Sequence, residues 1–154
     1  MSEDELAMSR FARLAFPASG AHVVRLRAQA PAECAIACNL VGDDKCDAFA
    51  FSRPGGTCTL LRAFRPDGQV ATGLRTVTGA LVTRSGTAGT WGDEVALREW
   101  LPAADDPDKC GLACDWRAST CRGYLFDGRE GAVRPCTLLE GVANQNDESF
   151  VRIT

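Results

Sequence analysis

Long apolar runs and histidine are both scarce in this chain, and each scarcity excludes a class of function. No stretch approaches the roughly 18–20 consecutive apolar residues that a membrane-spanning helix needs, so we expect no membrane span. His22 is the only histidine. It lies in a strand-like segment, where a structural role is more common than catalysis. We therefore predict a non-enzymatic protein that has no cofactor.

Clusters of basic residues are absent as well. The net charge is −3 and the arginines are scattered along the chain, so nucleic acid is not the expected partner. Residues 1–10 are acidic and contain no apolar stretch, so we expect no signal peptide there. Residues 1–84 are weakly positive overall and residues 85–154 are negative. Opposite charges of this kind favour possible self-association.

Cysteine, by contrast, is abundant, and the eight cysteines fall into two sets of similar spacing. The first set reads C-x3-C-x7-C-x11-C, the second reads C-x3-C-x6-C-x14-C, and both end in Cys-Thr-Leu-Leu. Two aromatic residues follow each third cysteine at the same offsets: Phe49 and Phe51, then Tyr124 and Phe126. The chain is therefore a tandem repeat. We expect two domains, at residues 13–84 and 88–154.

Each repeat predicts one helix followed by a hairpin. Pro31 and Pro107 mark helix starts, with Asp106 as the cap of the second helix, so the first two cysteines of each repeat share a helical face. A strand that alternates with period two follows, and a glycine-containing turn leads from it to the Cys-Thr-Leu-Leu strand. Leading strands are expected at 22–27 and 95–101, and closing strands at 76–84 and 149–154. The predicted class is α+β, with one helix packed on a small antiparallel sheet in each repeat.

The pairing of the cysteines follows in part from helix geometry. Residues i and i+4 of a helix have Cβ atoms about 5–6 Å apart, whereas a disulfide needs about 3.5–4.5 Å. Two schemes that join the helix to the hairpin remain in each repeat. We favour the nested scheme, because the second cysteine lies at the helix end nearest the following strand. Its pairs are Cys34–Cys58, Cys38–Cys46, Cys110–Cys136 and Cys114–Cys121.

Zinc held by four thiolates is the alternative use of each cysteine set. Structural zinc sites usually contain tight C-x2-C pairs, and here the pairs are C-x3-C on a helix. We therefore expect disulfides and no metal. Disulfides indicate an oxidising compartment, so the expected location is extracellular or periplasmic.

This pattern resembles the PAN/Apple domain family. The similarity rests on a C-x3-C helix, a C-x2-[FY]-x-F strand and a C-x-L strand in both halves of the chain. The resemblance implies a five-stranded antiparallel sheet around one helix, and it implies the same disulfide pairs as the nested scheme. Apple domains have a further terminal cysteine pair that this chain lacks, so the chain is similar to four-cysteine bacterial PAN modules. The resemblance also implies binding of a protein or carbohydrate, with no catalytic residues.

Several residues are candidates for contact with such a ligand. Leu40 and Trp116 occupy the same place in the two helices and are predicted to point away from their own sheets, at a domain–domain or partner surface. Arg53, Arg62 and Arg65 flank the first hairpin, where they are candidates for binding an anionic sugar, although a solvated surface is the commoner role of such residues. Trp91 and Trp100 are expected in the core rather than at a sugar-binding surface.

The predicted function is recognition of a protein or glycan on a disulfide-stapled scaffold. The alternative is a structural subunit or decoration of a surface assembly. Glycan binding by the monomer favours the first function, and polymerisation without any ligand favours the second.

Overall fold

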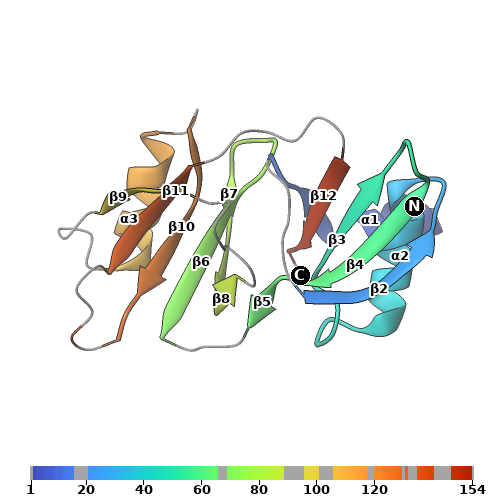
Figure 1. The fold of residues 1–154 in the computed structure, drawn as a ribbon, viewed down its shortest axis with the longest axis horizontal. Helices are drawn as coiled ribbons and strands as arrows, with labels where there is room; N and C mark the ends of the chain where they lie inside the picture. The colour runs from blue at the N-terminus through green and yellow to red at the C-terminus, as the bar shows by residue number, and fades with distance from the viewer. Residues whose placement is uncertain are drawn as a thin grey trace. The chain divides into compact units, whose positions relative to one another are not determined.

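The computed structural model describes residues 2–15, 21–65, 69–88, 96–100, 106–117, 120–129, 131, 135–140 and 147–153. The chain forms two compact units, which we describe separately (Figure 1). Unit 1 consists of residues 1–63 and 143–154, and unit 2 consists of residues 64–142. No helix among the described residues is long and apolar enough to cross a membrane.

Unit 1 is a five-stranded sheet that carries one long helix, α2. The strand order is β1-β12-β3-β4-β2, and each neighbouring pair is antiparallel. Helix α2 packs on β3 and β4 and contacts the short helix α1. The elements are α1 (Glu3–Met8), β1 (Phe11–Arg13), β2 (Ala21–Arg27), α2 (Pro31–Val41), β3 (Ala48–Ser52), β4 (Thr57–Arg62) and β12 (Asp147–Arg152).

Unit 2 repeats this plan. Its sheet has the order β7-β6-β10-β11-β9, and helix α3 packs on β10 and β11. A separate two-stranded ladder joins β5 (Phe64–Arg65) to β8 (Thr87–Ala88). The main elements are β6 (Val70–Arg75), β7 (Leu81–Ser85), β9 (Ala96–Trp100), α3 (Pro107–Asp115), β10 (Cys121–Asp127) and β11 (Cys136–Glu140).

Local sequence accounts for these elements. Asp106 accepts a hydrogen bond from the backbone N–H of Lys109 at 2.8 Å and caps α3. The methyl group of Ala30, at the start of α2, cannot accept a capping hydrogen bond. The carboxylate of Glu33 accepts a hydrogen bond from the N–H of Gln29, just before the helix, at 2.9 Å. In the turn between β3 and β4, Gly56 has φ +58°, a conformation that glycine adopts without steric cost.

The predicted closing segments, 76–84 and 149–154, do not belong to the sheets that the repeat predicts for them. We expected 76–84 to close the first sheet and 149–154 to close the second, and this expectation is wrong. Residues 76–80 connect β6 to β7, and the strand that pairs with β10 on the side away from β11 is β6. The strand beside β3 of unit 1 is β12. Alternating apolar residues identify a strand but do not identify its neighbour, because that neighbour is distant in sequence.

Unit 2 is consequently a circular permutation of unit 1. The central aromatic strand has one neighbour outside the hairpin. In the five-stranded sheet of unit 1 this neighbour is the last strand in the chain, β12, and in the five-stranded sheet of unit 2 it is the first, β6. The boundaries 13–84 and 88–154 remain a prediction about the sequence repeat. The sheets of the structure cut across them.

Aromatic rings fill the core of unit 1. Phe49 stacks on Phe150 of β12 with ring centroids 4.8 Å apart, and it meets Phe11 edge-on at 5.0 Å. In unit 2, buried Tyr124 and Phe126 take the places of Phe49 and Phe51. Both cores close against the cysteines of the helix, so the alternating aromatic strands lie where the sequence pattern predicts them.

Candidate functional site

Four disulfides join the helices to the hairpins. The bonded pairs are Cys34–Cys58, Cys38–Cys46, Cys110–Cys136 and Cys114–Cys121, which are the pairs of the nested scheme. All eight cysteines are buried. Because their sulfur atoms are covalently bonded to one another, they do not provide the thiolates that the zinc alternative requires. Among the described residues, no other group of histidine, cysteine and carboxylate side chains is arranged to hold a metal ion.

A buried arginine holds the second disulfide of unit 1. Arg152, the last residue of β12, is 3% exposed. Its guanidinium donates to the carbonyl oxygen of Cys46 at 2.9 Å and to the side-chain oxygen of Asn39 at 2.6 Å. A longer bond of 3.4 Å reaches the carbonyl of Cys38, and the guanidinium carbon lies 4.7 Å from the ring centroid of Phe11. One side chain therefore ties the closing strand to the end of the helix and to the ring of Phe11.

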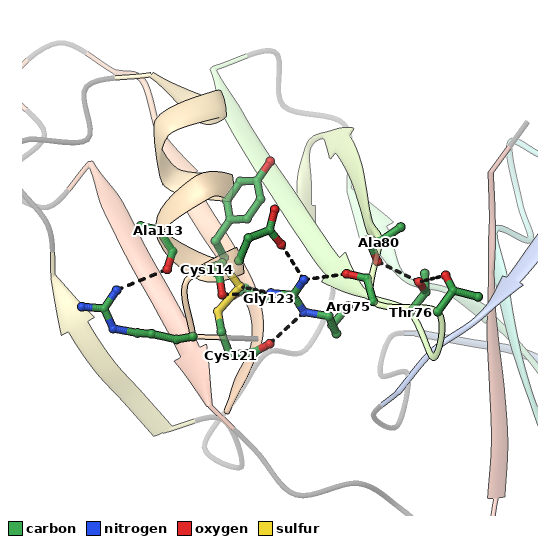
Figure 2. A network of polar contacts seen from close by, with 12 residues as sticks. Arg75, Thr76, Ala80, Ala113, Cys114, Cys121 and Gly123 are labelled. Carbon is green, nitrogen blue, oxygen red and sulfur yellow. Dashed lines mark hydrogen bonds and ion pairs between the residues drawn. A yellow bond between two sulfur atoms is a disulfide. The ribbon is translucent and has the colours of Figure 1, made fainter. Parts of the chain in front are cut away.

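Arg75 does the same in unit 2, at the end of β6 (Figure 2). It donates to the carbonyl oxygens of Cys114 at 3.0 Å and Cys121 at 3.2 Å. Its Nη1 pairs with the carboxylate of Asp115 at 2.6 Å, and Asp115 follows Cys114 as Asn39 follows Cys38. The planar fork of arginine suits this task, because several donors point at fixed acceptors at once.

The buried positions of Arg75 and Arg152 were not predicted from the sequence. Each lies at the end of a strand with apolar neighbours, at nearly the same distance after the fourth cysteine of its repeat. The repeated pairs Leu74–Arg75 and Val151–Arg152 were the sequence feature that could have identified the two arginines. A charged residue is rarely buried unless it is paired, so the pattern alone favoured a surface position.

Tyr124 crosses the sheet of unit 2. Its hydroxyl and that of Thr83 on β7 form a hydrogen bond of 2.8 Å. Burial is the main cause that raises the pKa of the Tyr124 phenol, and the hydrogen bond to Thr83 opposes this effect. The phenol therefore stays neutral through the physiological pH range, where it joins β10 to β7 across the intervening strand β6.

The two equivalent helix positions are exposed. Leu40 on α2 is 83% exposed, and Trp116, at the C-cap of α3, is 85% exposed. Leu112, one turn before Trp116, is 58% exposed. In unit 1, Leu6 and Ile36 line a shallow hollow beside Leu40, between α1 and α2. Each unit therefore has exposed apolar side chains at the C-terminal end of its longer helix.

Two of the candidate arginines lie on either side of strand β4 along the chain. Arg53 lies in the turn between β3 and β4, whereas Arg62 is the last residue of β4. The six-residue strand between them spans roughly 17 Å. Arg53 also forms an ion pair with Glu148 at 2.9 Å and lies over the ring of Phe51. Arg62 is exposed, and the side chain of Arg65 lies outside the described residues.

Three other expectations concern side chains that the structure does not describe. Trp91 lies outside the described residues, and only the backbones of Trp100, in β9, and of His22, in β2, are described. The expectations that both tryptophans lie in the core and that His22 is structural therefore remain predictions.

The fold and the disulfides together define a class: small α+β modules in which one helix is stapled to a hairpin. A family model described as PAN domain matches the chain twice, at residues 19–61 and 90–139. The chain belongs to the PAN domain family and contains two copies of the domain. No curated protein and no solved structure matches it. PAN domains are generally non-catalytic modules that bind proteins or carbohydrates.

Proposed function

We propose that this chain is a non-enzymatic extracellular recognition module that binds a protein or carbohydrate through the exposed end of helix α3. The observation that carries the proposal is the exposure of the Trp116 side chain, which is 85% accessible to solvent. Exposed tryptophan leaves a large apolar area in water. Tryptophan is also among the residues that contribute most at binding surfaces.

The neighbourhood of Trp116 supports this assignment. Leu112 lies four residues earlier on the same helical face and is also exposed. Asp108 and Asp115, on the same helix, are exposed carboxylates, and a polar rim around an apolar centre is typical of recognition surfaces. Leu40 gives unit 1 a smaller apolar surface at the equivalent position. The disulfides favour an extracellular location, because such bonds persist in oxidising compartments.

The test is ligand binding by a Trp116→Ala variant. Glycan arrays and extracellular matrix proteins immobilised on a biosensor serve as ligands, and the wild-type chain identifies those that bind. We expect binding to weaken at least tenfold in the variant, with a free energy of unfolding within about 0.5 kcal/mol of the wild type. The matched control is Val23→Ala, because Val23 is an exposed apolar residue of β2, in the other unit of the chain.

Equal binding by wild type and Trp116→Ala would contradict the proposed surface. Self-association of the wild-type chain that grows with concentration and needs no ligand would instead favour the structural-subunit function. Sedimentation of the same samples measures this directly. If Trp116→Ala abolishes the self-association, the surface at α3 is a contact between copies rather than a ligand site.

A further inference from the structure

Strands β6 and β12, which we call the closing strands of units 2 and 1 from here on, occupy equivalent places in their sheets. Each lies between an edge strand and the central aromatic strand, so β6 is flanked by β7 and β10, and β12 by β1 and β3. Each ends in a buried arginine that donates to the carbonyl of the third cysteine. Neither the backbone pairing nor the hydrogen bonds of the buried arginine therefore determine which strand completes which sheet.

One position, two residues before the arginine, differs sharply between them. It is Gly73 in β6, opposite Tyr124, and Phe150 in β12, opposite Phe49. Tyr124 and Phe49 occupy the same place in their repeats, three residues after the third cysteine. The equivalent position therefore pairs glycine with tyrosine in unit 2 and phenylalanine with phenylalanine in unit 1.

The site in unit 2 admits only glycine. The Tyr124 ring lies directly over Gly73, so a Cβ atom at residue 73 would overlap the ring. The ring is held there by the hydrogen bond of its hydroxyl with Thr83 on β7, which is the residue paired with Gly73 on the other side. A strand that carries phenylalanine at this position would have to expel the Tyr124 side chain from its place.

The site in unit 1 requires a large residue. Phe150 is buried and stacks on Phe49, which also contacts Phe11. Glycine at this position would remove one ring of the stack and leave a cavity about the size of a phenylalanine ring in the core. Cavities of this size are among the most destabilising changes in protein interiors. The two sites are thus filled from opposite sides. In unit 2 the ring of Tyr124, from the central strand β10, fills the site. In unit 1 the ring of Phe150, from the closing strand β12, fills part of it.

We infer that Gly73 and Phe150 are the residues that assign each closing strand to its sheet, so that unit 1 is a strand-binding site selective for the β12 sequence. The β6 sequence is rejected by unit 1 because it fills the site too little. The β12 sequence is rejected by unit 2 because it fills the site too much. This selectivity explains how two repeats with the same pattern fold into a permuted pair of units rather than a mixture of strand arrangements.

Three synthetic peptides added to the full-length Phe150→Gly variant test this inference. The first peptide has the native sequence of residues 145–154, the second that of residues 68–77, and the third is the second peptide with Gly73→Phe. The substituted chain keeps its own weakened β12, which a better-fitting peptide displaces. Native mass spectrometry and the rise in unfolding temperature measure binding.

We expect the first and third peptides to bind and the second to bind at least tenfold more weakly. Equal binding of the second and third peptides would overturn the inference, and so would failure of the first peptide to bind. A complementary measurement uses the whole chain without peptides. Gly73→Ala should lower the unfolding temperature much less in a Tyr124→Ala background than in the wild type, and an equal loss in both backgrounds would also overturn the inference.

Discussion

Removal of the Cys34–Cys58 disulfide, by changing both cysteines to alanine, is expected to lower the free energy of unfolding of unit 1 by about 3–4 kcal/mol. The bond closes a chain segment with a sequence separation of 24. In the loop-entropy account, constraining the unfolded chain over such a segment contributes about 3.5 kcal/mol. A whole small domain is stable by only about 5–15 kcal/mol. The variant should therefore be close to unfolding at physiological temperature.

The second disulfide of the same unit provides the comparison. Cys38–Cys46 has a sequence separation of 8, for which the same account gives about 2.5 kcal/mol. The two bonds of unit 2 provide a replicate, with separations of 26 and 7. Chemical denaturation followed by circular dichroism measures these losses. If the long and the short bond of a unit contribute equally, unfolded-chain entropy is not their main effect.

Tryptophan fluorescence shows which unit has been affected. All three tryptophans, Trp91, Trp100 and Trp116, lie in the chain segment of unit 2. Loss of a unit 1 disulfide should shift the transition seen by circular dichroism and leave the fluorescence transition near its wild-type midpoint. Loss of a unit 2 disulfide should shift the fluorescence transition.

Replacement of Arg152 by methionine is expected to destabilise unit 1 by about 3–5 kcal/mol. The change removes a buried guanidinium and leaves the carbonyl of Cys46 and the side-chain oxygen of Asn39 without these donors. Each buried acceptor that loses its partner costs about 1–3 kcal/mol. Lysine should recover only part of the loss, because one ammonium group does not reproduce the planar fork.

Arg53→Met is the matched control for this prediction. Arg53 forms an ion pair with Glu148 of the same strand β12, but its side chain is 63% exposed. An exposed pair of this kind contributes about 0–1 kcal/mol. Denaturant midpoints of the disulfide-intact proteins provide the measurement. A loss in Arg152→Met no larger than that in Arg53→Met would show that the buried arginine is not a structural anchor.

The local parts of this fold could be predicted from sequence because each has a short-range cause. The C-x3-C spacing places Cys110 and Cys114 on one helical face, Pro107 and Asp106 start that helix, and the alternation around Phe126 makes a strand. Covalent geometry then leaves few pairings for the cysteines. These features require no knowledge of distant residues.

The remaining features depend on distant residues and were not predictable in the same way. Strands β6 and β12 have similar sequence patterns and both end in a buried arginine. The residues that distinguish them are Gly73 and Phe150, which face a tyrosine and a phenylalanine of the neighbouring strands. The buried arginines follow from carbonyl groups that meet them only in the folded state. Arg53 and Arg62 are near in sequence, yet the extended strand β4 lies between them along the chain.

The stapled scaffold depends most directly on the disulfide bonds within each repeat. Digestion of the native, unreduced protein with trypsin and chymotrypsin, followed by mass spectrometry, measures that frame. We predict that the peptide containing Cys34 and Cys38 is attached only to peptides containing Cys46 and Cys58, and that the peptide containing Cys110 and Cys114 is attached only to those containing Cys121 and Cys136. Free thiols throughout, or bonds that join one repeat to the other, would contradict the stapled scaffold and the recognition function proposed for it.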